Sequence, residues 1–299
     1  MTRCSRRKPL VFALTIGVAA ALGLVAQPAL ADPAALAARA ASPQRIVSLS
    51  PTATEDLFAV GAGKQVVAVE EFSTYPKEAP RTKLSGFKPN AEAIAAYKPD
   101  LVIISDNLDN ITAQLTKLKI PVLKESVPTK LDGVYTQLAE IGKATGHAAE
   151  ATALIAKLKA KVAKTIAATP KPAKRLSAYY ELDQTLYSAT SKTFIGQVLA
   201  LLGITNIADK ARGAGSFPQL SAEYIIAANP DLIILADTVC CAQNAKTVAA
   251  RPGWSTIAAV KTGSVTVVDD AVASQWGPRI VQLLQAVSRA AIRLEKLGK

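Results

Sequence analysis

The chain has 299 residues, half of them hydrophobic, and a formal net charge of +12 at pH 7. This length is enough for two compact lobes, each with its own core. The lysines are spread over helix faces without interleaved aromatics, which argues against nucleic acid as a partner. The excess of positive charge weakly favours an anionic ligand, envelope surface or membrane headgroup, although a solvated cationic surface explains it more simply.

Residues 1–31 have the pattern of an export signal. A basic start precedes a mainly apolar stretch from Leu10 to Val25, and Ala29-Leu30-Ala31 has the small-x-small form of a cleavage site. Cleavage near Ala31 removes 31 residues and four positive charges, so we expect a mature chain of 268 residues with a net charge of +8. The arginine pair near the start is compatible with either general or twin-arginine export.

We expect the mature protein to be soluble and exported, in the periplasm or at the cell exterior. After cleavage, no stretch approaches the roughly 18 consecutive apolar residues of a membrane span. Cys4 precedes the apolar stretch of the signal, so it is not placed to carry a lipid anchor.

Residues 32–44, rich in Ala and Pro, are predicted to form a tether, and residues 45–145 a first lobe. In this lobe short apolar runs alternate with helical patterns. The predicted strands are 45–49, 65–69, 101–104 and 122–123, and the predicted helices are 53–60 and 111–118. Strands that alternate with helices predict a mainly parallel sheet with both faces covered. The loop at 70–76 leaves the carboxyl end of a strand, where such sheets bind ligands.

A long amphipathic helix is predicted at 147–168, within an inter-lobe segment of residues 146–169. Its apolar residues recur at three- and four-residue steps from Ala151 to Ile166, and Pro170 follows its end. At about 1.5 Å per residue, such a helix spans on the order of 30 Å. We expect it to join two lobes as one stiff rod.

Residues 170–299 repeat the same alternation. The predicted strands are 176–180, 232–235 and 265–268, and the predicted helices are 194–202, 254–260 and 282–297. The predicted fold class is therefore α/β, with two lobes of mainly parallel sheets flanked by helices and joined by one long α-helix. A cleft between the lobes follows from this arrangement.

One pattern occurs once on each side of the rod, which indicates an internal duplication. Residues 90–105 read NAEAIAAYKPDLVIIS and residues 221–236 read SAEYIIAANPDLIILA; they match without gaps at eight of sixteen positions. In each copy an Asn or Ser can cap a short helix, and Pro-Asp ends that helix before an apolar strand. The alternative is that the two segments converged independently, because a helix followed by Pro-Asp and a strand is common in α/β proteins.

Catalytic and metal-binding patterns are not found. The mature chain has one histidine, His147, where the rod begins, so neither Ser-His-Asp catalysis nor a site for a bare metal ion is favoured. We expect a protein that is not an enzyme and has no cofactor or metal of its own, so that a metal would arrive already chelated. The alternative is an envelope enzyme or sensor on the same two-lobed frame, which would need a titratable cluster in the cleft.

Cys240 and Cys241 are adjacent, just past the second-lobe repeat. Outside the cytoplasm an exposed thiol pair tends to oxidise, and neighbouring cysteines can close a strained ring across their own peptide bond. A vicinal disulfide and two free thiols are both compatible with the sequence.

Several motifs, taken together and in order, resemble the extracytoplasmic solute-binding proteins of ABC importers for cobalamin, ferric siderophores and haem. They are RIVSLSPTATEDLFAVGAG (45–63), FSTYP (72–76), the duplicated pair at 90–105 and 221–236, and WGPRIVQLL (276–284). The resemblance covers roughly residues 44–297. It implies a monomeric receptor with two α/β lobes, one long connecting helix, modest lobe motion and a metal chelate held in a shallow cleft.

The resemblance also implies a docking surface for the membrane permease and its ATPase. Glu92 and Glu223 match the two glutamates, one per lobe, that dock onto permease arginines in this family. Two carboxylates in similar settings suit a two-fold symmetric permease, because opposite charges steer and register the encounter. The alternative is that each glutamate only complements the dipole of its own short helix.

A second set of residues is expected to line the cleft. Phe72 and Tyr75 match first-lobe positions at which the family places aromatics against the ligand. The second-lobe candidates are Phe217, Trp276, Arg279 and, as a looser match, Tyr187. Aromatic faces suit a macrocycle or catecholate, and an arginine can hold a peripheral carboxylate or amide. The expected ligand is a ferric siderophore or cobalamin, ahead of haem.

Overall fold

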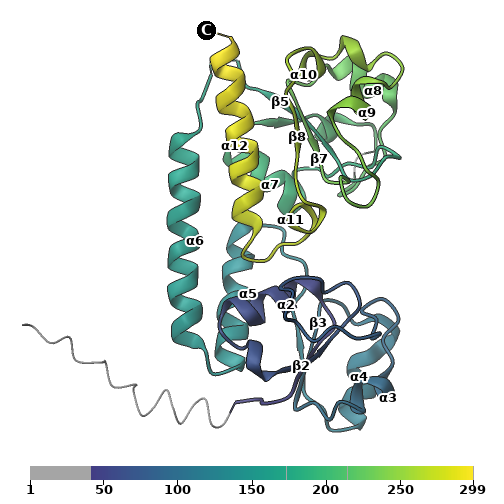
Figure 1. Cartoon of the computed structure of the whole chain (residues 1–299), viewed down its shortest axis with the longest axis vertical. Coiled ribbons are helices and arrows are strands. Elements are labelled where there is room, and N and C mark those ends of the chain that lie inside the picture. The colour runs from purple at the N-terminus through teal and green to yellow at the C-terminus, as the bar shows by residue number, and fades with distance from the viewer. Residues whose placement is uncertain (1–41, 173, 214, 299) are drawn as a thin grey trace, which may run out of the picture.

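The computed structural model describes residues 42–172, 174–213 and 215–298. It has two α/β lobes, one above the other in Figure 1, with the helices α6 and α12 running side by side along one flank. The predicted signal, its cleavage site and residues 32–41 of the predicted tether lie outside the described residues. The end of the tether contacts the first lobe, because the Gln65 side chain donates a hydrogen bond to the Pro43 carbonyl over 2.7 Å.

The first lobe contains a four-stranded, all-parallel sheet in the order β2-β1-β3-β4. Its strands are β1 (Ile46–Ser48), β2 (Val66–Val69), β3 (Leu101–Ile104) and β4 (Val122–Lys124). Its helices are α2 (Pro51–Ala59), α3 (Ala91–Ala95), α4 (Ile111–Lys117) and α5 (Leu131–Ala144), with short 3-10 turns at η1 (Gly63–Gln65) and η2 (Leu108–Asn110). All four residues of β3 are buried, as expected for a central parallel strand covered on both faces.

The second lobe has the equivalent parallel sheet, β6-β5-β7-β8. Its strands are β5 (Ser177–Glu181), β6 (Thr205–Asn206), β7 (Leu232–Leu235) and β8 (Val265–Val267). Its helices are α7 (Phe194–Leu201), α8 (Ala222–Ala228), α9 (Ala245–Ala249), α10 (Ala258–Lys261), α11 (Asp270–Ser274) and α12 (Ile280–Leu297), with 3-10 turns at η3 (Ile207–Lys210) and η4 (Trp254–Thr256). Strand for strand in chain order, the two lobes share one topology.

The predicted repeat has a structural counterpart in its aspartates. Asp100 accepts a hydrogen bond from the backbone N–H of Arg45 over 2.8 Å, at the entrance of β1. Asp231 accepts one from the backbone N–H of Ser177 over 2.8 Å, at the entrance of β5. In both lobes the aspartate of the Pro-Asp step, which directly precedes β3 or β7, therefore binds the start of the first strand of the lobe, β1 or β5. Shared topology and shared contacts support duplication over convergence.

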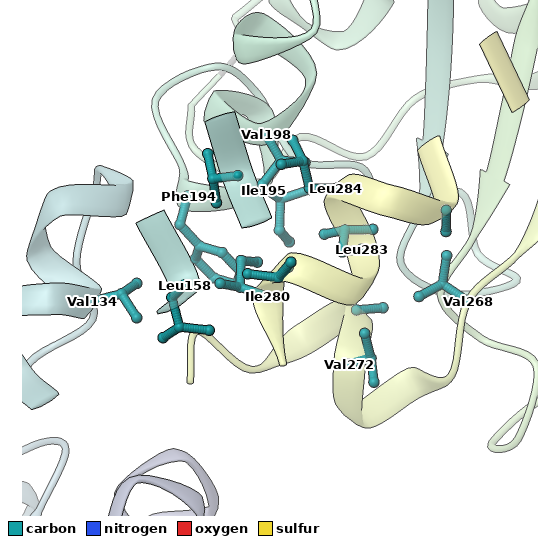
Figure 2. Packing of buried hydrophobic residues seen from close by; sticks show 14 of the residues in the cluster. Val134, Leu158, Phe194, Ile195, Val198, Val268, Val272, Ile280, Leu283 and Leu284 are labelled. Carbon is teal, nitrogen blue, oxygen red and sulfur yellow. The ribbon is translucent and has the colours of Figure 1, made fainter. Parts of the chain in front are cut away.

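The predicted rod is α6 (Ala148–Ala168), which begins directly after His147. Its buried residues, among them Leu158 and Val162, face α5 on one side and α12 on the other. Figure 2 shows Leu158 in a cluster with Val134 of α5 and Ile280 of α12. The hydroxyls of Thr169 and Ser288 are 2.7 Å apart and join the end of the rod to α12.

The hydrophobic cluster along the rod is continuous between the lobes, since it includes Ile46 of β1 and Tyr180 of β5. Close-packed apolar surfaces resist separation because opening them exposes hydrophobic area to water. The rod and the core on which it lies therefore favour a small lobe rotation over wide opening.

Several elements differ from prediction. The predicted helix at 254–260 is wrong as a single element, because Ile257 is extended and separates η4 from α10. The cause is a cap from outside the segment: the Asn229 side chain accepts a hydrogen bond from the Ala258 amide over 2.7 Å and starts a new helix there. The largest element that was not predicted is α5, a helix of 14 residues, and the short elements β6, α9 and α11 were not predicted either. Within the described residues, none of the helices combines the length and apolar character needed to cross a membrane.

Candidate ligand cleft and docking surface

Side chains near the carboxyl ends of the strands connect the two lobes. All strands within each sheet are parallel, so these ends share one edge of the sheet. Glu55 lies on α2, which follows β1, and its carboxylate binds the guanidinium of Arg279 at the start of α12. Because this contact joins the strand-end region of one lobe to that of the other, it marks the seam between the two lobes.

The first-lobe rim presents two aromatic side chains to solvent. Phe72 is 54% exposed and Phe87 is 71% exposed, and their rings meet edge to face with centroids 5.8 Å apart. The buried carboxylate of Glu70 holds this loop, accepting hydrogen bonds from the Phe72 amide over 2.8 Å and from the Ser73 hydroxyl over 2.7 Å. Phe72 was predicted for the cleft and Phe87 was not. The only signal for Phe87 is its place in a short Ser-Gly-Phe loop just before the repeat.

Tyr75 and Arg279, both predicted for the cleft, lie together. The guanidinium carbon of Arg279 is 4.0 Å from the centroid of the Tyr75 ring, in a cation–π contact between the lobes. The Nε of Arg279 donates to Glu55 over 2.8 Å, and a second hydrogen bond joins the same two groups. Burial raises the pKa of Glu55, while the hydrogen bond and charge of Arg279 oppose that rise. That Arg279 also holds a ligand stays a prediction.

Trp276 is half-buried at the seam. Its ring packs against Phe194 of α7 with centroids 6.0 Å apart, and its indole N–H is buried without a hydrogen-bond partner among the described residues. The next residue, Gly277, lies so close to the first lobe that a Cβ there would be 3.3 Å from Oδ1 of Asp56. Burial, followed by the charges of Glu55 and Glu125, holds the pKa of Asp56 well above its usual range.

Tyr187 and Phe217, the remaining cleft candidates, lie on the second-lobe rim. Tyr187 follows the end of β5, and its segment runs beside that of Phe217, where the Ser188 amide donates to the Pro218 carbonyl over 2.9 Å. Both rings are about half exposed. The two candidates therefore share one edge of the second lobe, and their contact with ligand stays a prediction.

A buried ion pair lies behind this second-lobe edge. Both terminal nitrogens of Arg251 donate to Glu181 at the end of β5, each over 2.6 Å, and the guanidinium stacks on Trp254 at 4.5 Å from the ring centroid. The carboxyl of Asp237, at the end of β7, is buried without a hydrogen-bond partner among the described residues. Burial and the nearby charge of Glu181 raise the pKa of Asp237 to about 7.

The cysteine pair lies on a loop fastened by Asp270. Its carboxylate accepts hydrogen bonds from the amides of Thr238 and Cys240, each over 2.8 Å. Both cysteines are free thiols, with Sγ atoms 2.7 Å apart. Burial, then hydrogen bonding to Cys241, raises the pKa of the Cys240 thiol to about 12. The structure contains the pair as two thiols, and the vicinal disulfide stays a hypothesis.

Glu92 and Glu223, the predicted docking residues, are exposed at equivalent places. Glu92 is the second residue of α3 and Glu223 the second of α8, each after a side-chain N-cap. The two helices lie on the side of the molecule opposite α6 (Figure 1). Hydrogen bonds to its own backbone amide and to Ser221 lower the pKa of Glu223 and keep it charged. No group of three or more His, Cys, Asp or Glu in the described parts of the chain is arranged to hold a metal ion.

A family model described as periplasmic binding protein matches residues 46–272. The chain belongs to this family. It is 32% identical over 257 residues to the uncharacterized ABC transporter substrate-binding lipoprotein YvrC of Bacillus subtilis, covering 83% of this chain and 80% of that protein. It is 34% identical over 257 residues to a cobalamin-binding protein of Halobacterium salinarum, covering 83% and 69%. Among solved structures, the periplasmic heme-binding protein RhuT of Roseiflexus sp. RS-1 superposes with a TM-score of 0.73 at 25% identity, covering 84% and 98%.

Proposed function

We propose that this periplasmic binding protein is the substrate-binding component of an ABC importer, and that it captures a metal chelate between its lobes and delivers it to the membrane permease. The observation that carries the proposal is the placement of exposed aromatics at the strand-end edges of both lobes. Phe72, Tyr75 and Phe87 come from the first lobe, and Tyr187 and Phe217 from the second. Flat apolar faces on two rims suit a broad ligand such as a macrocycle or a siderophore complex.

Cobalamin and ferric siderophores are the preferred ligand classes, ahead of haem. Support for cobalamin comes from the name of the Halobacterium relative, whereas the solved relative RhuT is named for heme. The comparisons therefore support a metal chelate as the ligand more strongly than they support any one chelate. We infer that the metal enters as part of the chelate. No catalytic role is proposed.

Delivery requires a docking surface, and we assign it to Glu92 and Glu223. Their equivalent positions on α3 and α8 match a permease with two-fold symmetry. We further propose export through the N-terminal signal, with cleavage near Ala31.

Calorimetric titration of the mature chain tests the function. The ligands are cyanocobalamin, a ferric hydroxamate siderophore and haemin, and we expect one of the first two to saturate a single site with a Kd below about 1 µM, equivalent to roughly −8 kcal/mol. Replacing Phe72 and Phe87 together by Ala should weaken that binding by about tenfold or more, because two aromatic contacts are lost. Ala substitution of Leu118 at the end of α4 and Leu297 at the end of α12, which are exposed and apolar away from the strand ends, is the matched control. Failure of all three ligands to bind would contradict the proposal.

A further inference from the structure

The contact between Glu55 and Arg279 joins residues 224 positions apart and is the most enclosed ion pair between the lobes in the described structure. The side chain of Glu55 is 2% exposed and that of Arg279 is 17% exposed. Two parallel hydrogen bonds connect the guanidinium to both carboxylate oxygens. This fork-on-fork geometry is the strongest form of a carboxylate–arginine contact and leaves little freedom to either partner.

The remaining sides of the guanidinium are also occupied. One face lies on the ring of Tyr75, and Nη1 is 4.0 Å from Oδ1 of Asp269. At Gly277, two residues before the arginine, an added Cβ would be 3.6 Å from Oε2 of Glu55. Arg279 is therefore enclosed by one aromatic and two acids, and its positive charge is already balanced within the protein.

The second-lobe arginine behind the rim is arranged in the same way. Arg251 is bound through both terminal nitrogens to Glu181 and stacks on an aromatic ring. Arg279 and Arg251 are thus both tied to buried glutamates. A ligand carboxylate that sought Arg279 would have to displace Glu55 and leave a buried carboxylate unpaired, which is costly.

We propose that Glu55 is a specificity-determining residue, which withholds the charge of Arg279 from the cleft so that the cleft selects chelates with amide or hydroxyl peripheries over chelates with free carboxylates. This inference rests on the proposed function and narrows its ligand class. Glu55 acts through Arg279 and is a positioning residue. The same pair fastens the lobes together, so ligand selection and lobe closure share one contact.

Native protein provides the first test. We expect it to bind cyanocobalamin at least about tenfold more tightly than a cobalamin in which one side-chain amide is hydrolysed to the acid, and to prefer cyanocobalamin to haemin, which carries two propionates. With Arg279 already paired, a carboxylate at the seam loses hydration and gains no charged contact from that arginine. Tighter binding of the carboxylate form, or of haemin, would overturn the proposal. Binding of neither cobalamin, haemin nor a ferric siderophore would instead contradict the proposed function.

The second test frees the arginine. Glu55→Gln keeps the shape of the side chain but removes its charge, and we expect the preference for the amide over the carboxylate cobalamin to shrink by about tenfold or to reverse. Glu55→Asp retains a carboxylate and should keep the native preference. Adding Arg279→Gln to Glu55→Gln removes the freed cation and should abolish the gain in carboxylate affinity. A gain that persists without Arg279, or an unchanged preference in Glu55→Gln, would overturn the inference.

Glu181→Gln is the matched control, because it frees an arginine behind the second-lobe rim while leaving Arg279 paired. It should leave the amide-to-carboxylate preference as in the native protein. If Glu55→Gln does not fold, the double substitution replaces both charges by neutral groups of similar shape, and comparing it with the native protein on the two cobalamins still decides whether the charge pair sets the preference.

Discussion

The two lobes share a framework and differ at the ends of their strands. Both sheets have the same strand order, and in both a Pro-Asp aspartate binds the entrance of the first strand. Past the carboxyl ends the resemblance stops. The first lobe places a buried glutamate, Glu70, under an aromatic loop, whereas the second places an ion pair, Glu181 with Arg251, behind its rim.

This difference separates the parts of the sequence that maintain the fold from the parts that we propose contact ligand. The shared features are backbone contacts at the amino ends of the strands, far from the cleft. The divergent features are all at the carboxyl ends, where open α/β sheets bind ligands. Equivalent substitutions in the two lobes should therefore have equal effects on the shared framework and unequal effects at the cleft.

The largest effect is expected on delivery, where the lobes should be equivalent. Charge reversal at both Glu92 and Glu223 to Arg should reduce uptake to background, because each lobe then repels the permease arginines, while ligand affinity stays unchanged. Each single reversal should cost a similar part of the uptake rate. Reversal of Glu78 and Glu140, two exposed acids away from α3 and α8, is the control. Normal transport by the double variant would show that these glutamates only complement their helices.

Much of the framework was predictable because it depends on local pattern. β3, β7 and the end of α6 were predicted to the residue, since an apolar run after Pro-Asp and a helix bounded by breakers both leave clear marks. α5 was missed because Gly133 and Gly142 lower its helix propensity. Gly142 is required for packing, as a Cβ there would lie 2.4 Å from that of Ala151 on the rod.

The seam was less predictable because its partners are remote in sequence. Trp276, Arg279 and Tyr75 were named as cleft residues, yet nothing local indicates that Glu55 would bind Arg279 from 224 residues away. The one available signal is a pair of adjacent acids, Glu55 and Asp56, in the helix that follows the first strand of the chain. Whether the candidate residues contact ligand depends on a bound complex and stays a prediction.

The next effect tests the ion pair that has no first-lobe counterpart. Arg251→Met should lower the free energy of unfolding by about 3–5 kcal/mol, because it leaves the carboxylate of Glu181 buried without its partner. Urea denaturation measures this loss. Adding Glu181→Gln removes the stranded charge and should recover more than half of it. If Arg251→Met is as stable as the native protein, the ion pair between Arg251 and Glu181 is not shielded from water as described.

Each lobe also buries a carboxyl whose pKa is raised to about 7, which predicts a pH dependence. Burial raises the pKa of Glu125 to about 7 in the first lobe, and burial with Glu181 raises that of Asp237 to about 7 in the second. Between pH 8 and 5 the folded chain then binds protons that the unfolded chain, with ordinary carboxyls, does not. Stability should therefore rise as pH falls through 7, by roughly 2 kcal/mol for each group.

Melting temperatures at pH 8 and pH 5.5 measure this rise. At about 2–4 °C per kcal/mol for a protein of this size, the gain on acidification should be several degrees. Glu125→Gln and Asp237→Asn should each remove a similar part of it, because the amide binds no proton in either state. A melting temperature that falls between pH 8 and 5.5 would contradict the direction assigned to both groups.

The smallest expected effect tests the shared framework most directly. Asp100→Ala removes hydrogen bonds of 2.7 and 2.8 Å to the amides of Gln44 and Arg45, and Asp231→Ala removes two of 2.8 Å to the amide and hydroxyl of Ser177. Each substitution loses two charge-assisted bonds near the surface, so each should cost about 1–2 kcal/mol in urea denaturation.

The two losses should agree within about 0.5 kcal/mol and should add in the double variant, since the sites are in different lobes and share no partner. Asp132→Ala, at an exposed acid in the first turn of α5, should change stability by less than about 0.5 kcal/mol and serves as the control. A loss at one aspartate without a loss at the other would mean that the duplication survives in sequence and topology while only one lobe still depends on its Pro-Asp contact.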